Sequence, residues 1–198
     1  MRRYSARVPR LVLTVIGDDR AGLVSALASV VTDHGGNWEQ SQLAELAGKF
    51  AGIVVVGVPA ERQADLTEAL RGLDGMLDVS VHAGEEPDAS DGTGGSGASE
   101  GDDGAATVEA EGGEPQRLTV DLLGNDRPGI VREVSSVLSE HHLSIESMTT
   151  GTREAPMAGG LLFEAHVVAV VPASSDTGAL RDDLERLASE LLVDIAVG

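Results

Sequence analysis

The sequence has no cysteine, only four aromatic residues and few cations among its 198 residues. Without cysteine the chain can form no disulfide, thiolate metal site, iron–sulfur cluster or cysteine nucleophile. Lys and Arg total 14 against 33 Asp and Glu, which gives a formal net charge of -19. Because a field of that sign repels polyanions, we expect no direct contact with nucleic acid or with an anionic membrane.

Long apolar runs are also missing. None approaches the ~20 residues that a membrane-spanning helix needs. A basic cluster near the N-terminus, Arg2, Arg3, Arg7 and Arg10, precedes an apolar run at residues 11–16 that is too short for a signal peptide and ends in acidic residues. We interpret the cluster as a solvated terminus and expect a cytoplasmic protein.

A glycine-rich acidic stretch divides the chain at residues 83–116. It holds nine glycines and ten acidic residues, with no Lys, Arg or aromatic residue. Such a stretch cannot bury enough apolar surface to offset the entropy cost of ordering it. We therefore predict two domains, residues 1–82 and 117–198, joined by a disordered linker that carries more than half of the net charge.

The two flanks are copies of each other. A shift of 107 residues lays residues 17–39 over residues 124–146, and nine of the 23 aligned positions are identical. Most of the other positions exchange one apolar residue for another or one small polar residue for another. Self-similarity of this kind indicates two copies of one domain.

Each copy predicts the same order of elements, βαββαβ. Short apolar runs predict the strands, and apolar residues spaced at i, i+4, i+7 and i+8 predict the first helix. The strands are expected at 11–16, 38–47, 50–58 and 77–81, and in the second copy at 118–123, 145–152, 161–171 and 193–197. This order with short connections predicts an α+β fold, a ferredoxin-like antiparallel sheet with both helices on one face.

The third strand of each copy does not alternate between apolar and polar residues. Residues 53–56 and 167–171 are continuously apolar. A strand exposed on one side should alternate, so the pattern predicts that the sheet face away from the helices is covered too. Copies of about 80 residues would each bury only a modest fraction of their surface alone. We infer that they pair with each other, with another chain, or both.

The turn between the first strand and the first helix is the strongest candidate for a site. Asp19 and Asp126 stand where helix N-caps are expected, and Gly22 and Gly129 stand at the third helical position. Glycine there costs roughly 1 kcal/mol against alanine. Either it lets a carboxylate or another small anion reach the N–H groups of the helix start, or it merely allows close packing.

A zwitterionic amino acid matches this turn chemically. Its carboxylate could take the backbone N–H groups, while its ammonium could meet Asp19 or Asp126 together with Asn37 or Ser144. No catalytic set accompanies the turn, because the five histidines lack metal-ligand spacing and no phosphate loop or nucleophile elbow is present. We expect no enzymatic activity, no metal and no cofactor.

At these residues the chain resembles the ACT-domain family. GDDRAGLV and GNDRPGIV are similar to its strand-to-helix signature, and DHGGNWEQSQL and EHHLSIESMTT are similar to the segments that follow. The tandem arrangement, with QSQLAELAGKFAGIVVV and TREAPMAGGLLFEAHVVAVVP, resembles the glycine cleavage system transcriptional repressor family. The resemblance covers residues 8–82 and 117–198. The chain departs from the family's pattern at two of these positions: Ala21 stands in place of the usual proline in the first copy, and Ser144 stands in place of asparagine in the second.

The resemblance implies a non-catalytic sensor that binds a small amino acid, with glycine as the first choice. It also implies a protein partner, a transcription factor, and pairing of the domains or a homo-oligomer. The residues carried over as ligand-binding are Asp18, Asp19, Arg20, Ala21, Gly22, Leu23, Asn37, Asn125, Asp126, Arg127, Pro128, Gly129, Ile130 and Ser144. The alternative is a regulatory or assembly subunit that docks on a metabolic enzyme, with the glycines serving packing.

Overall fold

A computed structural model describes residues 8–84, 116–155, 159–172, 175 and 177–198. The core of the predicted linker, 85–115, lies outside the described residues, as does most of the basic N-terminal cluster. The outermost residues of the predicted linker belong to the domains instead, because Ala83 ends one strand and Gln116 begins the next.

The first copy contains six main elements in the predicted order. They are β1 (Arg10–Asp18), α1 (Leu23–Asp33), β2 (Asn37–Leu46), β3 (Lys49–Gly57), α2 (Gln63–Arg71) and β4 (Asp78–Ala83), with a short 3-10 turn at Ala60–Arg62 before α2. The second copy repeats them as β5 (Gln116–Asn125), α3 (Ile130–Glu140), β6 (Ser144–Glu154), β7 (Leu161–Val171), α4 (Thr177–Leu191) and β8 (Val193–Val197). The predicted βαββαβ order is confirmed in both copies.

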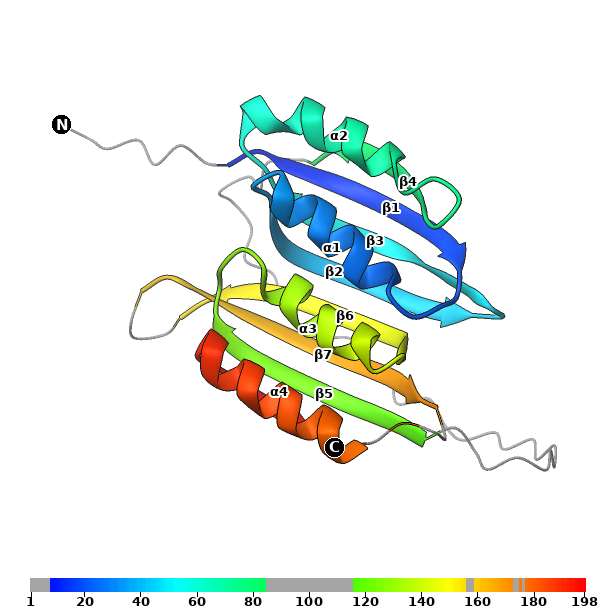
Figure 1. The fold of residues 1–198 in the computed structure, drawn as a ribbon. Coiled ribbons are helices and arrows are strands. Elements are labelled where there is room, and N and C mark those ends of the chain that lie inside the picture. Colours follow the sequence, from blue (N-terminus) through cyan, green and yellow to red (C-terminus); the bar gives the residue numbers. More distant parts are fainter. Residues whose placement is uncertain (1–7, 85–115, 156–158, 173–174, 176) are drawn as a thin grey trace, which may run out of the picture.

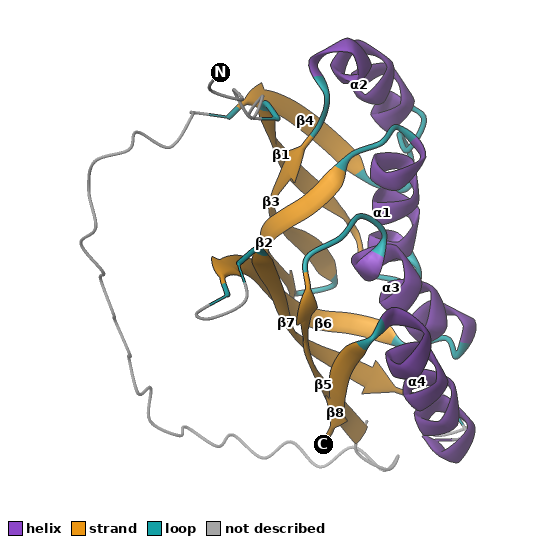
Figure 2. Ribbon diagram, turned by 90° about the vertical axis from the view of Figure 1, so that its left-hand side faces the viewer, coloured by secondary structure: helices purple, strands orange, loops and turns teal. Residues whose placement is uncertain are grey.

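The eight strands form one antiparallel sheet in the order β4-β1-β3-β2-β6-β7-β5-β8. The copies join at their second strands, where Ser41 is opposite Thr150 and Ala44 is opposite Ser147. All four helices cover the same face, with α1 and α3 side by side at the junction (Figures 1 and 2). The prediction that the copies pair with each other is therefore confirmed.

The core lies between this sheet and the helix layer. Leu13 and Val54 on the strands and Leu66 and Leu184 on the helices are fully buried. Burying side chains of this size contributes roughly 1.5–3 kcal/mol each. The sheet is thus anchored on one face over its whole width, which fixes the strand register.

The opposite face of the sheet is open within the described residues, so the cover that the apolar runs predict is not supplied by this part of the chain. Strand β3 does alternate in burial, since Val54 and Val56 are fully buried whereas Ile53 is 51% exposed. No element among the described residues covers this open face, as Figure 2 shows. The apolar run was read correctly as a strand, but its outward side chains have no partner within the described chain.

The first helix of each copy begins later than predicted. Gly22 and Gly129, not the aspartates, are the N-cap residues, with φ of 92° and 97° and no capping side chain. Positive φ is a conformation that glycine adopts without steric cost. The glycines therefore precede the helix, so the helix-interior penalty does not apply to them, and Pro128 lies in the turn before the helix.

Candidate functional site

Two polar junctions lie where the copies meet. Ser144, at the start of β6, shares its one hydroxyl hydrogen between the two carboxylate oxygens of Asp19, at distances of 2.7 and 2.9 Å. Asn37, at the start of β2, donates to Oδ2 of Asp126 at 2.9 Å. Each aspartate follows the first strand of one copy and meets the second strand of the other. The predicted residues thus come together crosswise between the copies.

The turns that carry these aspartates are held by the neighbouring hairpins. The N–H of Asp19 donates to the carbonyl of Gly48 at 3.0 Å, and that of Asp126 donates to the carbonyl of Leu161 at 2.8 Å. These contacts are equivalent in the two copies. They fix each aspartate beside the start of a helix, where the first N–H groups have no acceptor within the helix.

The turn glycines face the other copy's first helix. A Cβ on Gly22 would lie 3.0 Å from Oγ of Ser139, whereas a Cβ on Gly129 would lie 3.9 Å from Cγ2 of Thr32. Only the first of these distances is tighter than ordinary contact. The positive φ at both positions therefore explains glycine more completely than close packing does.

The two junctions differ in how well they satisfy their carboxylates. Both oxygens of Asp19 accept hydrogen bonds, but Oδ1 of Asp126 is buried and has no hydrogen-bond partner among the described residues. Burial raises the pKa of Asp126 above its usual value, and the hydrogen bond from Asn37 offsets part of that rise. A buried polar atom without a partner costs free energy, so the Asp126 junction is electrostatically incomplete.

Small cavities adjoin both junctions. One is lined in part by Asp19, Arg20 and Gly22, and the other in part by Asn37, Arg127 and Gly129. Each has a volume of about 10 Å³, which is room for roughly one water molecule. Neither holds an amino acid in this conformation.

The remaining predicted residues divide into lining and peripheral groups. Leu23 lines the first cavity, and Ile130 lines the second. Exposed positions in or beside the turns are Asp18, Ala21, Asn125 and Pro128. Asp18 forms an ion pair with Lys49, and the hydrogen bond from that lysine lowers the pKa of Asp18. We therefore place Asp18 outside the junction.

A buried hydroxyl cluster at the β2–β6 seam lies outside the predicted site residues. Oγ1 of Thr150 accepts a hydrogen bond from Nε1 of Trp38 at 3.2 Å and shares one with Oγ of Ser41 at 2.9 Å. All three residues are buried. The available signal was that Ser41 and Thr150 occupy inward-facing strand positions, where a hydroxyl needs a partner.

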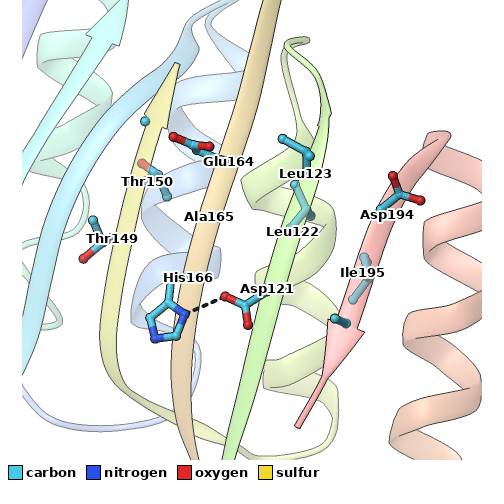
Figure 3. Close-up of a pocket in the computed structure, with 12 residues that line it drawn as sticks. Asp121, Leu122, Leu123, Thr149, Thr150, Glu164, Ala165, His166, Asp194 and Ile195 are labelled. Carbon is cyan, nitrogen blue, oxygen red and sulfur yellow. Dashed lines mark hydrogen bonds and ion pairs between the residues drawn. The ribbon is translucent and has the colours of Figure 1, made fainter. Parts of the chain in front are cut away.

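A hollow of about 720 Å³ lies on the open face of the second copy, away from the predicted site residues (Figure 3). Asp121 and His166 form a 2.6 Å contact on its floor. Glu164 and Asp194 line the hollow as well, beside apolar residues such as Leu122 and Ile195. Nothing in the turn motifs indicated this feature.

The described part of the chain holds no helix both long and apolar enough to cross a membrane. Within the same residues, no group of three or more His, Asp or Glu side chains is arranged to hold a metal ion.

Comparison with known proteins gives both a family and relatives. A 38% identity over 82 residues relates the chain to the UPF0237 protein of Methanopyrus kandleri, covering 41% of this chain and 84% of that protein. The glycine cleavage system transcriptional repressor of Escherichia coli is 23% identical over 183 residues, covering 91% of this chain and 85% of that protein.

Solved structures give the same fold. Aspartate kinase from Synechocystis superposes with a TM-score of 0.52 at 15% identity, covering 90% of this chain and 26% of that one. Family models described as ACT domain match residues 9–84 and 119–189. These matches span most of the sequence, and the chain belongs to the ACT-domain family as a tandem of two such domains.

Proposed function

We propose that this protein is a regulatory amino-acid sensor whose ligand binds at the crossed junctions between its two ACT domains. The proposal is supported by family membership and by the similarity to a glycine cleavage system transcriptional repressor over 91% of the chain. Glycine is the first ligand to test, because that relative is named for glycine cleavage. The role is non-catalytic and cytoplasmic.

The Asp126 junction is the binding site in this proposal. Its buried Oδ1 has no partner, so the ammonium of an amino acid would add both a hydrogen bond and a compensating charge. Both oxygens of the Asp19 carboxylate lie within hydrogen-bond distance of the Ser144 hydroxyl, and neither is a buried atom without a partner, so this carboxylate offers less. This unsatisfied oxygen is the single observation that carries the assignment.

The ligand carboxylate has a complementary setting beside the same junction. The first N–H groups of α3 and its helix dipole favour an anion. Arg127 and Arg132 line the adjoining cavity, although Arg132 also donates to Asp33 of α1 at 2.8 Å. A zwitterion thus meets a carboxylate on one side and positive potential on the other.

Binding requires the interface between the copies to open. A cavity of about 10 Å³ is too small even for glycine. Admitting the ligand must therefore move the turn of the second copy away from β2 and α1 of the first. A ligand shifts such an equilibrium by its differential affinity for the two states, and this movement is the signal passed to a partner.

Titration calorimetry of the full chain with the common amino acids, glycine first, tests the proposal. Asp126→Asn is expected to weaken binding at least about tenfold, because a charge-assisted hydrogen bond is lost. The matched variant Asp19→Asn is expected to bind within about twofold of the wild type. Absence of heat with every amino acid contradicts sensing, and the reverse order of the two variants contradicts the assigned junction.

The partner in this proposal is a transcription factor, contacted as protein and not through DNA. The acidic chain supports that choice, because its net charge of -19 repels nucleic acid. Affinity capture with the full chain, with and without glycine, tests it. Recovery of a metabolic enzyme without any transcription factor would favour the alternative role of an enzyme-docking subunit.

A further inference from the structure

The open face of the sheet has a different chemistry in its two halves. One row of side chains crosses all eight strands: Ser80, Thr14, Ile53, Gln42, Thr149, His166, Asp121 and Ala196. In this row Ile53 of the first copy takes the place that His166 takes in the second. Likewise Thr14 matches Asp121. The two copies have the same backbone arrangement. We therefore attribute the difference between their outward side chains to different contacts made by the two halves of the open face.

The first half of the open face has an apolar centre and a charged rim. Ile16 is 50% exposed and Ile53 is 51% exposed, and both line a groove of about 310 Å³. Ion pairs occupy the two ends of the strands, Arg10 with Glu39 at one end and Asp18 with Lys49 at the other. An apolar centre within a polar rim is the anatomy of a protein interface.

We propose that a second copy of this chain covers the first half of the open face, sheet against sheet. The two-fold axis runs along the strands between β1 and β3. With this axis β1 of one chain lies over β3 of its partner, and Ile16 packs among apolar side chains. The edge strand β4 lies over β2 of the partner, where Ser80 is opposite Gln42 and can share a hydrogen bond with it.

The cost of burying polar groups favours this arrangement over a centred one. An axis between β2 and β6 would place Ile53 over the partner's second domain, where His166 and Asp121 form their 2.6 Å contact. The off-centre axis instead carries the two second domains to opposite sides of the dimer. The Asp121–His166 contact shown in Figure 3 then lies outside the interface, which avoids the cost of burying this polar pair against an apolar side chain.

The size of the surface suits a dimer of two such chains. Four strands about 4.8 Å apart and about 30 Å long give a footprint of roughly 550 Å². Side-chain relief makes the accessible area larger, so it approaches the ~800 Å² that one partner contributes to a standard interface. Facing sheets about 10 Å apart interdigitate their outward side chains. This surface is separate from the proposed ligand junctions, which lie on the helix side.

Sedimentation velocity of the full chain from about 1 to 100 µM, a range around the micromolar affinities of modest interfaces, tests this dimer. We expect a concentration-dependent dimer in the wild type. Ile53→Glu is expected to weaken it at least about 100-fold, because it buries an unpaired charge. The matched variant His166→Gln, at the equivalent place in the second copy, is expected to leave the dimer unchanged. Circular dichroism checks that both variants fold.

Three outcomes overturn the proposal: a monomeric wild type at 100 µM, a dimer that Ile53→Glu leaves intact, or equal loss in both variants. The strand pairing has its own test. Thr14→Lys is expected to be monomeric alone, but to form a heterodimer with Ile53→Glu chains, because β1 of one chain lies over β3 of the other. Failure of the mixture to dimerise overturns the assigned axis.

Discussion

Two turn glycines show how single residues set the geometry of the junctions. Both adopt positive φ, yet a side chain would meet different surroundings at each, 3.0 Å from Ser139 at Gly22 and 3.9 Å from Thr32 at Gly129. Both positions therefore require a positive φ, but only Gly22 is also restricted by a close neighbouring atom. This pair separates conformational cost from packing cost within one protein.

We predict that Gly129→Ala lowers the free energy of unfolding by about 1–2 kcal/mol, the cost of a left-handed conformation with a Cβ. Gly22→Ala is expected to cost more, because Oγ of Ser139 must also move. Adding Ser139→Ala to Gly22→Ala should return the cost to that of Gly129→Ala. Urea denaturation measures all three, and equal costs for the two single variants would contradict the steric part.

The carboxyl of Asp126 makes stability depend on pH. Burial raises its pKa in the folded state above the ordinary value of 3.8, so folding favours the protonated form. The stability that this group contributes is full below about pH 3.8, its unfolded value, and is lost as pH rises through the folded value. Ionised Asp126 therefore opposes folding at neutral pH.

Comparison with Asp126→Asn isolates that effect. We predict that the variant gains stability relative to the wild type as pH rises from about 3.5 to 7, because only the wild type acquires a partly buried charge. Urea denaturation of both proteins at several pH values measures the difference. A difference that stays constant over this range would contradict the proposed cause.

At the scale of elements, the seam between β2 and β6 depends on one buried hydroxyl. Thr150 serves Trp38 and Ser41 together. We predict that Thr150→Val, which keeps the shape, lowers the free energy of unfolding by about 2–4 kcal/mol, because it leaves two buried groups unpaired. Ser41→Ala, which keeps the Trp38 bond, is the control and should cost about 1 kcal/mol. Chemical denaturation decides, and a larger cost for Ser41→Ala would contradict this order.

Local elements were predictable from the sequence because their signals are local. The apolar runs placed every strand to within a few residues, and the last strand, Val193–Val197, was predicted with the same bounds. The helix starts were misplaced because Asp19 and Asp126 have the chemistry of caps but bond across the domain boundary. A capping residue cannot be distinguished by type from one that serves a distant strand.

The crossed grouping of the site residues was beyond reach of the sequence for a related reason. Each copy carries its own turn and its own second strand, and nothing in the pattern says that the second strands pair at their edges. Once β2 lies beside β6, Asn37 must approach Asp126 and not Asp19. The sequence therefore indicates which polar residues lie near the turns, but their hydrogen-bond partners depend on how the two domains pair.

At the scale of the whole molecule, the two domains act as one structural unit. The sheet runs through both, and α1 and α3 pack together, with Ser25 and Ser136 in hydrogen-bond contact at 3.1 Å. In a single copy on its own, the second strand (β2 or β6) would be an exposed edge of the sheet. An exposed edge strand can pair with another chain. The pairing of β2 with β6 therefore protects both strands from such contacts.

Cutting the chain between the domains tests whether this seam holds without a tether. A tether can maintain an effective concentration on the order of millimolar, so a weak interface would separate once the tether is cut and the sample is diluted to about 1 µM, far below that value. We predict that a chain with a protease site introduced within residues 85–115 stays one particle after cleavage, and unfolds in one transition. The uncut protein is the control in gel filtration and denaturation. Two half-sized species after cleavage would contradict this prediction. They would mean that the pairing of β2 with β6 and the crossed hydrogen bonds are too weak to hold the two domains together without the covalent connection.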